Sequence, residues 1–148
     1  MPSERLEELR SGLLDDMYEL KQENQKLFER SYQIDLGLLT SDISMDLVQQ
    51  LELLAPFGSK NPKPAFRFDD VIVSEVKYMG ERNQHARFKI WSRGTYGTAP
   101  LQCVLFNKAC DYSHLLKNGG ALSFAIGSVE CQVWQGKPRI QVLVEHMD

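Results

Sequence analysis

One stretch of nine residues carries the groups best suited to binding a polyanion. Every second residue from position 85 to 93 is a cation, an imidazole or an indole: His85, Arg87, Lys89, Trp91 and Arg93. Side chains of a strand alternate between its two faces, so this set would share one face and leave Ala86, Phe88 and Ile90 for a core. Cations for phosphates and a flat ring for a base are what single-stranded nucleic acid binding requires. A solvated strand face of any protein also carries Lys and Arg.

Other cations and aromatic residues could extend this surface, or could be ordinary surface and rim packing. They are Arg82, Lys108, Trp134, Lys137 and Arg139. The formal net charge of the chain is −3, but the stretch 82–110 contains five basic residues and no acidic one. A local basic patch on an acidic chain points to a polyanion more directly than the overall charge does.

The residue types needed for catalysis lack the necessary spacing. The three histidines show no metal-binding motif, and the adjacent pair Asp69-Asp70 would diverge on a strand. The three cysteines include no CxxC pair, which argues against a disulfide framework or a zinc site and favours reduced thiols in the cytoplasm. We therefore expect no active site, no metal site and no cofactor in this chain.

The first thirty residues have a helical pattern. Leucines and a methionine recur at spacings of three, four or seven, and acidic residues follow Ser3, a suitable N-cap. The stripe consists of Leu6, Leu9, Leu13, Met17, Leu20 and Leu27. It predicts a long helix over 3–30 that docks on the rest of the chain, on a second copy or on another protein. No apolar run approaches the ~20 residues of a membrane span, so no membrane role is expected.

A second, shorter helix is predicted over 41–54, capped by Thr40 or Ser41, and completes a helical lead-in over 1–55. Residues 56–65 then form a proline-rich connector, which can continue neither a helix nor a central strand. Its structural residues are Pro56, Phe57, Gly58, Asn61, Pro62 and Pro64. We place the domain boundary at this connector.

From residue 66 the hydrophobic pattern changes to period two. It predicts strands over 68–78, 85–93, 100–107, 121–134 and 139–145, with a helix over 108–118 between the third and the fourth. Three strands, a helix and two strands match the five-stranded Greek-key barrel of the OB fold, which favours that fold over an SH3-like barrel. The predicted class is therefore a mostly β chain, with a barrel over 66–148 preceded by helices.

The segment from Leu51 to Gly58, continued by residues 61–66, resembles the RecJ family of single-strand-specific 5′→3′ DNA exonucleases. In that family a Leu-x-Pro-Phe-Gly-x-Gly-Asn-Pro-x-Pro-x-Phe segment leads into an OB domain. Further similar segments are Ile34-Asp35, Leu38-Leu39, His85-Ala86-Arg87-Phe88, Trp134-Gln135-Gly136 and Ile140-Gln141. Lys60 stands where the family has glycine. The resemblance covers roughly residues 27–148.

The resemblance implies that the chain is the OB domain with its leading helix. The family's nuclease core, which binds two divalent metals (Mn²⁺ or Mg²⁺), has no counterpart here. The expected function is to hold single-stranded DNA for such a core in DNA repair and recombination, with the N-terminal helix joining the core or another repair protein. The alternative is an interaction module whose basic face binds a replication or repair partner, such as the acidic tail of the single-strand-binding protein.

Overall fold

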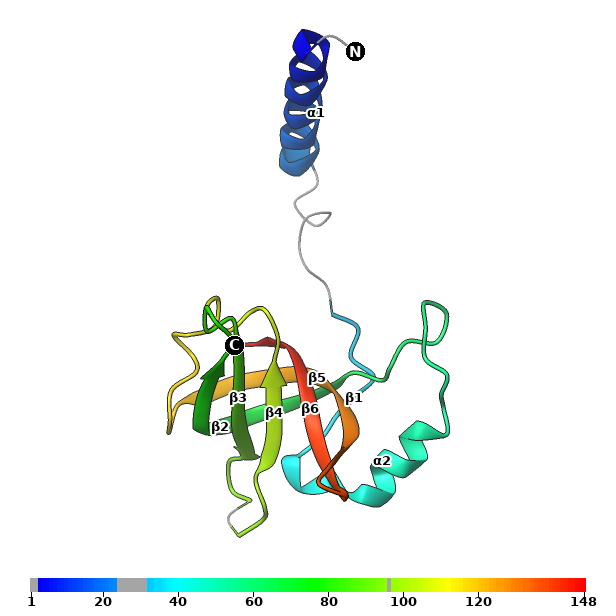
Figure 1. The fold of residues 1–148 in the computed structure, drawn as a ribbon, viewed down its shortest axis with the longest axis vertical. Coiled ribbons are helices and arrows are strands. Elements are labelled where there is room, and N and C mark those ends of the chain that lie inside the picture. Colours follow the sequence, from blue (N-terminus) through cyan, green and yellow to red (C-terminus); the bar gives the residue numbers. More distant parts are fainter. Residues whose placement is uncertain (1–2, 24–31, 96) are drawn as a thin grey trace. The chain divides into compact units, whose positions relative to one another are not determined.

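The computed structural model describes residues 3–23, 32–95 and 97–148. The chain separates into two compact units, Met1–Tyr32 and Gln33–Asp148, and each unit is described here by itself. Figure 1 shows helix α1 in the first unit and a small barrel in the second.

Helix α1 extends from Ser3 to Glu23. Its described side chains, residues 7–19, are all exposed, and Leu9, Leu13 and Met17 are each more than half accessible. The remainder of the expected helix, residues 24–30 with Leu27, lies outside the described residues. No helix in the described part of the chain is both long and apolar enough to cross a membrane.

The second unit is built on five strands that close into a barrel. They are β2 (Phe66–Met79), β3 (His85–Ser92), β4 (Leu101–Leu105), β5 (Ala121–Trp134) and β6 (Lys137–Met147). The strands neighbour one another in the order β2-β3-β4-β6-β5, and a further pairing between β5 and β2 closes the ring. All pairings are antiparallel except that of β4 with β6. This arrangement is the five-stranded Greek-key barrel of the OB fold, as the sequence predicts.

The barrel core follows from the alternation of side chains along the strands. Phe68, Phe88, Ile90 and Leu105 are fully buried. On β3, residues 86, 88, 90 and 92 are buried, while residues 85, 87, 89 and 91 are exposed or half-buried. The predicted register of this strand is therefore confirmed.

The domain boundary expected at the connector, residues 56–65, does not match the division of the chain, which falls between residues 32 and 33. A short strand, β1 (Leu36–Gly37), pairs in parallel with the start of β2. The backbone N–H of Thr40 donates to Ser92 Oγ at 2.9 Å, and the backbone N–H of Ser92 donates to Thr40 Oγ1 at 2.8 Å. Both residues are buried. Residues 33–55 are thus part of the barrel unit and not a separate lead-in.

The helix expected over 41–54 is shorter in the structure. A single 3-10 turn covers Thr40–Asp42, and helix α2 extends from Met45 to Glu52. Ser44 caps α2, because its Oγ accepts the backbone N–H of Leu47 at 3.2 Å. Val48 packs into the barrel core. Thr40 therefore hydrogen-bonds with Ser92 of β3 and does not cap α2.

The helix expected over 108–118 is also absent; the segment is a series of turns. Its Leu116 and Ala109 are buried in the barrel core, so the apolar spacing reflects contact with the barrel. Two α-type hydrogen bonds remain, from the N–H groups of Tyr112 and Leu116. Gly119 and Gly120 then lead into β5.

The proline-rich connector folds back on itself. The Asn61 side-chain amide donates to the carbonyl oxygens of Leu54 and Pro56, at 2.7 and 3.0 Å. Gly58 and Asn61 exchange both of their backbone hydrogen bonds. One asparagine therefore fixes the turn of the connector, whereas Lys60 is exposed.

Candidate nucleic-acid interface

Two adjoining hollows lie on the outer surface of the barrel, over β3, β4 and β6 and the adjoining residues of β2 and β5. The larger, of about 570 Å³, is lined by Arg87, Gln102, Gln132, Trp134, Arg139 and Gln141, together with Met45 and the apolar side chains of Pro100, Pro138 and Ile140. The smaller, of about 230 Å³, is lined by Glu75, Lys77, Arg87, Lys89, Gln102 and Arg139. Arg87, Gln102 and Arg139 line both hollows. The two hollows therefore form one continuous depression, called the groove below.

Strand pairing brings the groove residues together from distant parts of the sequence. Lys89 lies opposite Gln102 in the β3–β4 pair, and Gln102 lies opposite Gln141 in the parallel β4–β6 pair. Directly paired residues point to the same face of a sheet. Three neighbouring strands thus contribute polar side chains to one surface, in the region where OB barrels bind oligonucleotides.

A β-bulge adds Lys77 to this surface. The β2–β3 register shifts between Ser74 and Lys77, and Glu75 adopts a φ of +49°. The extra residue reverses the alternation of β2, so Lys77 lies opposite Arg87. Without the bulge, Lys77 would share the inward face of Val71 and Val73.

The smaller hollow has a strongly positive lining. Lys77, Arg87, Lys89 and Arg139 surround it, with Glu75 as its acidic residue. Lys89 Nζ lies 2.7 Å from Glu75 Oε2. Within the described ranges, neither Arg87 nor Arg139 forms an ion pair, and both are exposed. Two arginines of the groove are therefore available to an incoming anion.

Trp134 stands at the far end of the larger hollow, where β5 turns into β6. Gln135 and Gly136 both have positive φ, 49° and 74°, as expected for the tight two-residue turn of a hairpin. Trp134 is 61% exposed. At the same end of the barrel, helix α2 lies beside the hairpin (Figure 1), and Met45 Sδ lies 3.9 Å from Cys131 Sγ. An exposed indole thus borders a partly apolar hollow, as a base-stacking site requires.

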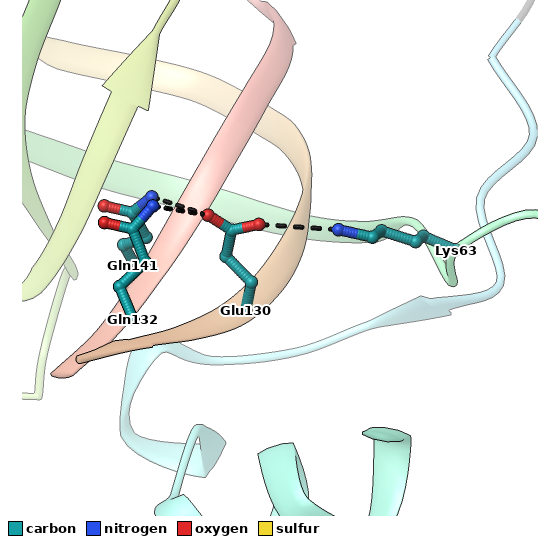
Figure 2. Close-up of polar contacts among 4 residues, drawn as sticks. All are labelled: Lys63, Glu130, Gln132 and Gln141. Carbon is teal, nitrogen blue, oxygen red and sulfur yellow. Dashed lines mark hydrogen bonds and ion pairs between the residues drawn. The ribbon is translucent and has the colours of Figure 1, made fainter. Parts of the chain in front are cut away.

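Glu130 links the larger hollow to the connector (Figure 2). Its Oε1 accepts hydrogen bonds from the side-chain amides of Gln132 at 3.0 Å and Gln141 at 2.7 Å. Its Oε2 lies 3.4 Å from Lys63 Nζ. Lys63 follows the Asn61 turn, so the connector is held against the strands that form the groove.

The structure does not gather all ten predicted binding residues. Arg87, Lys89, Trp134 and Arg139 line the groove. The other six line neither hollow: His85, Trp91, Arg93, Arg82, Lys108 and Lys137. Three of the six contact other residues, and three lie beside the groove or away from it.

Three of these six have polar partners elsewhere. His85 Nδ1 accepts the backbone N–H of Asn107 at 3.0 Å, and its ring packs edge-on against Phe106. Arg93 Nε lies 3.2 Å from Asp70 Oδ1. Lys108 Nζ donates to the backbone carbonyl of Glu145 at 2.9 Å.

The remaining three lie beside the groove or away from it. Trp91 is half-buried opposite Ile72 of β2. Arg82 is exposed on the loop between β2 and β3, and Lys137 is exposed opposite Trp134.

Five polar groove residues were not predicted: Glu75, Lys77, Gln102, Gln132 and Gln141. Gln102 and Gln141 alternate with buried apolar residues in their strands, a pattern that signals an outward position. Their meeting depends on the β4–β6 pairing, which local patterns do not specify. Lys77 depends on the bulge, for which the sequence offers no clear signal.

No three His, Cys, Asp or Glu side chains among the described residues are grouped so that they could hold a metal ion. The buried thiol of Cys103 is also unsuited to chemistry, because desolvation raises its pKa well above the usual range and disfavours the thiolate. The groove therefore offers charge, hydrogen bonds and an aromatic ring.

Similarity to known proteins covers most of the chain. The RecJ OB domain family model matches residues 34–146. The "Single-stranded-DNA-specific exonuclease RecJ" of Bacillus subtilis (strain 168) is 24% identical over 113 residues. That match covers 76% of this chain and 14% of the relative, so the chain corresponds to a small part of that protein's length.

Solved structures that superpose on part of the chain include one named as a mitochondrial single-stranded DNA binding protein and one named as an SSB domain. Mitochondrial Rim1 of S. cerevisiae superposes with a TM-score of 0.43 at 12% identity, covering 57% of this chain and 91% of that chain. The SSB domain of a Synechococcus sp. protein superposes with a TM-score of 0.39 at 11% identity, covering 56% and 91%. The matched region is an oligonucleotide-binding fold and not a catalytic nuclease domain, and the chain belongs to the RecJ OB-domain family.

Proposed function

We propose that the barrel binds single-stranded DNA along the groove. The observation that carries this proposal is the pair Arg87 and Arg139. These exposed arginines lie on β3 and β6, the strands on either side of β4, and have no acidic partner in the described structure. Phosphates would lie along the cationic hollow, and a base would stack on Trp134.

The family supports the same choice of ligand. The Bacillus subtilis relative is named as specific for single-stranded DNA. In a nuclease of this kind, a barrel without catalytic groups would hold the strand while another domain cuts it. We propose this holding role for the present chain. The metal ions of the reaction would then belong to the nuclease domain.

The proposal is tested by titrating a fluorescent single-stranded oligonucleotide with the purified chain at several salt concentrations. We expect single-stranded DNA to bind more tightly than a duplex of the same length, because a duplex cannot stack its bases on Trp134. The affinity should fall as salt rises, since phosphate contacts release counterions. Equal binding of both forms, or no binding at low salt, would contradict the proposal.

A protein partner with an acidic tail would use the same cations, and competition separates the two possibilities. If single-stranded DNA is the ligand, an acidic peptide should displace it only weakly, because the peptide has no base to stack. If the acidic peptide displaces all of the bound oligonucleotide when the peptide is less concentrated than the oligonucleotide, the chain is better explained as a protein-interaction module.

A further inference from the structure

Two carboxamides in the larger hollow have their orientation fixed by one carboxylate. The amides of Gln132 and Gln141 both donate to Glu130 Oε1. A carboxylate only accepts hydrogen bonds, so each amide must turn its NH₂ group toward Glu130 and its carbonyl oxygen away. Figure 2 shows this arrangement: both Oε1 atoms point away from Glu130, in the same direction.

The two carbonyl oxygens are unoccupied acceptors. In the described structure, neither Gln132 Oε1 nor Gln141 Oε1 receives a hydrogen bond. Gln141 as a whole is only 8% exposed, yet no buried side-chain N or O atom among the described residues lacks a partner. Gln141 Oε1 must therefore reach solvent, and the hollow is the space that this side chain lines. Gln132 and Gln141 lie diagonally across the β5–β6 pair and donate to the same oxygen atom, which brings the two amides together on one side of Glu130.

The position of Glu130 is itself fixed by an ion pair with Lys63. Its second oxygen faces Lys63, which belongs to the connector. Rotating the Glu130 side chain would break both amide hydrogen bonds and this ion pair. The orientation of the two glutamines is thus preorganised before any ligand binds, which lowers the cost of ordering them on binding.

We propose that Gln132 and Gln141 form a base-reading subsite that prefers bases with an exocyclic amino group. Two adjacent acceptors match the NH₂ group of cytosine or adenine. The corresponding position of uracil or thymine is a carbonyl oxygen, which would face the two acceptors without a hydrogen atom between them. Trp134 lines the same hollow and supplies the stacking surface. This inference rests on the proposed binding of single-stranded DNA in the groove.

Cytosine and uracil provide the sharpest test, because their ring sizes are equal and they differ at the amino position and the neighbouring ring nitrogen. Deoxyribose oligonucleotides of one length, carrying only cytosine or only uracil, would be titrated with the full chain at neutral pH. We expect the cytosine strand to bind at least about fivefold more tightly, within the range of a well-placed polar contact to a base.

The matched variants are Gln132→Leu and Gln50→Leu. Both glutamines are exposed, so neither change should prevent folding, and a thermal unfolding curve checks this. Gln132→Leu removes one of the two acceptors and should lower the affinity ratio of cytosine to uracil, while Gln141 still presents its carbonyl oxygen. Gln50 lies on α2 and lines neither hollow, so Gln50→Leu should leave the ratio unchanged.

A third variant tests Glu130 as a positioning residue. Glu130→Ala removes the common acceptor, so the amides can turn their NH₂ groups into the hollow and accommodate uracil. The affinity ratio of cytosine to uracil should fall. If the wild type binds both strands equally, or if Gln132→Leu keeps the wild-type ratio, the subsite is overturned while DNA binding stands. If the wild type binds neither strand, the proposed function fails, and the subsite fails with it.

Discussion

Lys89 Nζ lies 2.7 Å from Glu75 Oε2 across the β2–β3 pair, within the hollow that Arg87 and Arg139 also line. The carboxylate occupies a place in which a phosphate oxygen would make the same contact. Glu75 reaches this position through the bulge that also exposes Lys77. An acid at the centre of a cationic hollow would compete with the phosphate backbone for Lys89.

Replacing Glu75 with glutamine should therefore strengthen binding of single-stranded DNA. We expect a gain of roughly two- to fivefold at low salt, the size of a surface charge interaction, and a smaller gain at high salt because of screening. Fluorescence anisotropy titrations measure the gain in affinity at low salt and at high salt. Asp111→Asn is the matched control, since Asp111 is exposed and lines neither hollow. Equal gains in the two variants would mean that only net charge matters.

The arginines shared by both hollows should account for part of the salt dependence. Arg87→Ala and Arg139→Ala should each reduce the slope of log affinity against log salt by about 0.7, as expected for one lost phosphate contact on a single strand. Lys117→Ala removes the same charge outside the groove and should leave the slope unchanged. A slope equal to that of the wild type in both arginine variants would place the DNA elsewhere.

Trp134→Ala should weaken binding without changing the salt slope. Loss of a stacked base costs ~1–3 kcal/mol of binding free energy, and no charge is removed. Trp91 provides the comparison, because it is half-buried against β2 and lines neither hollow. Titrations at two salt concentrations should show the larger loss for Trp134→Ala. A larger loss for Trp91→Ala would mean that bases stack beside the groove and not in it.

The register of β3 predicts opposite effects for neighbouring residues. Phe88 is fully buried, so Phe88→Ala should lower the free energy of unfolding by ~3–5 kcal/mol. Arg87→Ala should change it by less than about 0.5 kcal/mol, as is usual at an exposed site. Urea denaturation of the two variants measures both values. Similar losses in the two would contradict the assignment of faces.

The strands of the barrel were predictable because each one is specified by residues close together in the sequence. Alternation along residues 85–93 assigns each side chain to a face, and glycines mark the turns. The N-terminal boundary was not predictable, because it depends on Thr40 and Ser92, two residues 52 positions apart that exchange hydrogen bonds. Small polar residues such as these are typical of helix caps, and the sequence pattern favours that local interpretation.

The candidate site was predicted only in part, for the same reason. Arg87 and Lys89 follow from one strand, and Trp134 and Arg139 from one hairpin. Their assembly into a groove depends on the parallel β4–β6 pairing, and the contribution of Lys77 depends on the bulge at Glu75. The residue types of His85, Arg93 and Lys108 are visible in the sequence, but the partners that these side chains contact in the structure are not.

The hydrogen bonds between Thr40 and Ser92 lead to a prediction about the boundary. Ser92→Ala removes the acceptor of the buried Thr40 N–H, and an unsatisfied buried donor costs ~1–3 kcal/mol. The free energy of unfolding, measured by urea denaturation, should fall by that amount. Ser123→Ala serves as the control, because Ser123 is an exposed serine on β5 and should change it by less than about 0.5 kcal/mol.

Deleting residues 1–32 tests the same boundary from the other side. Every core residue in the described part of the chain lies within 33–148, including Val48 of α2. The shortened chain should therefore keep a single cooperative unfolding transition, with a midpoint close to that of the full chain. Loss of that transition would place part of the core in the first unit.

A longer deletion removes residues 33–44 as well. It deletes β1 and Thr40, and leaves both Ser92 and the edge of β2 without their partners. The longer deletion should clearly lower the midpoint of the unfolding transition. An unchanged midpoint would mean that the barrel begins at the proline-rich connector.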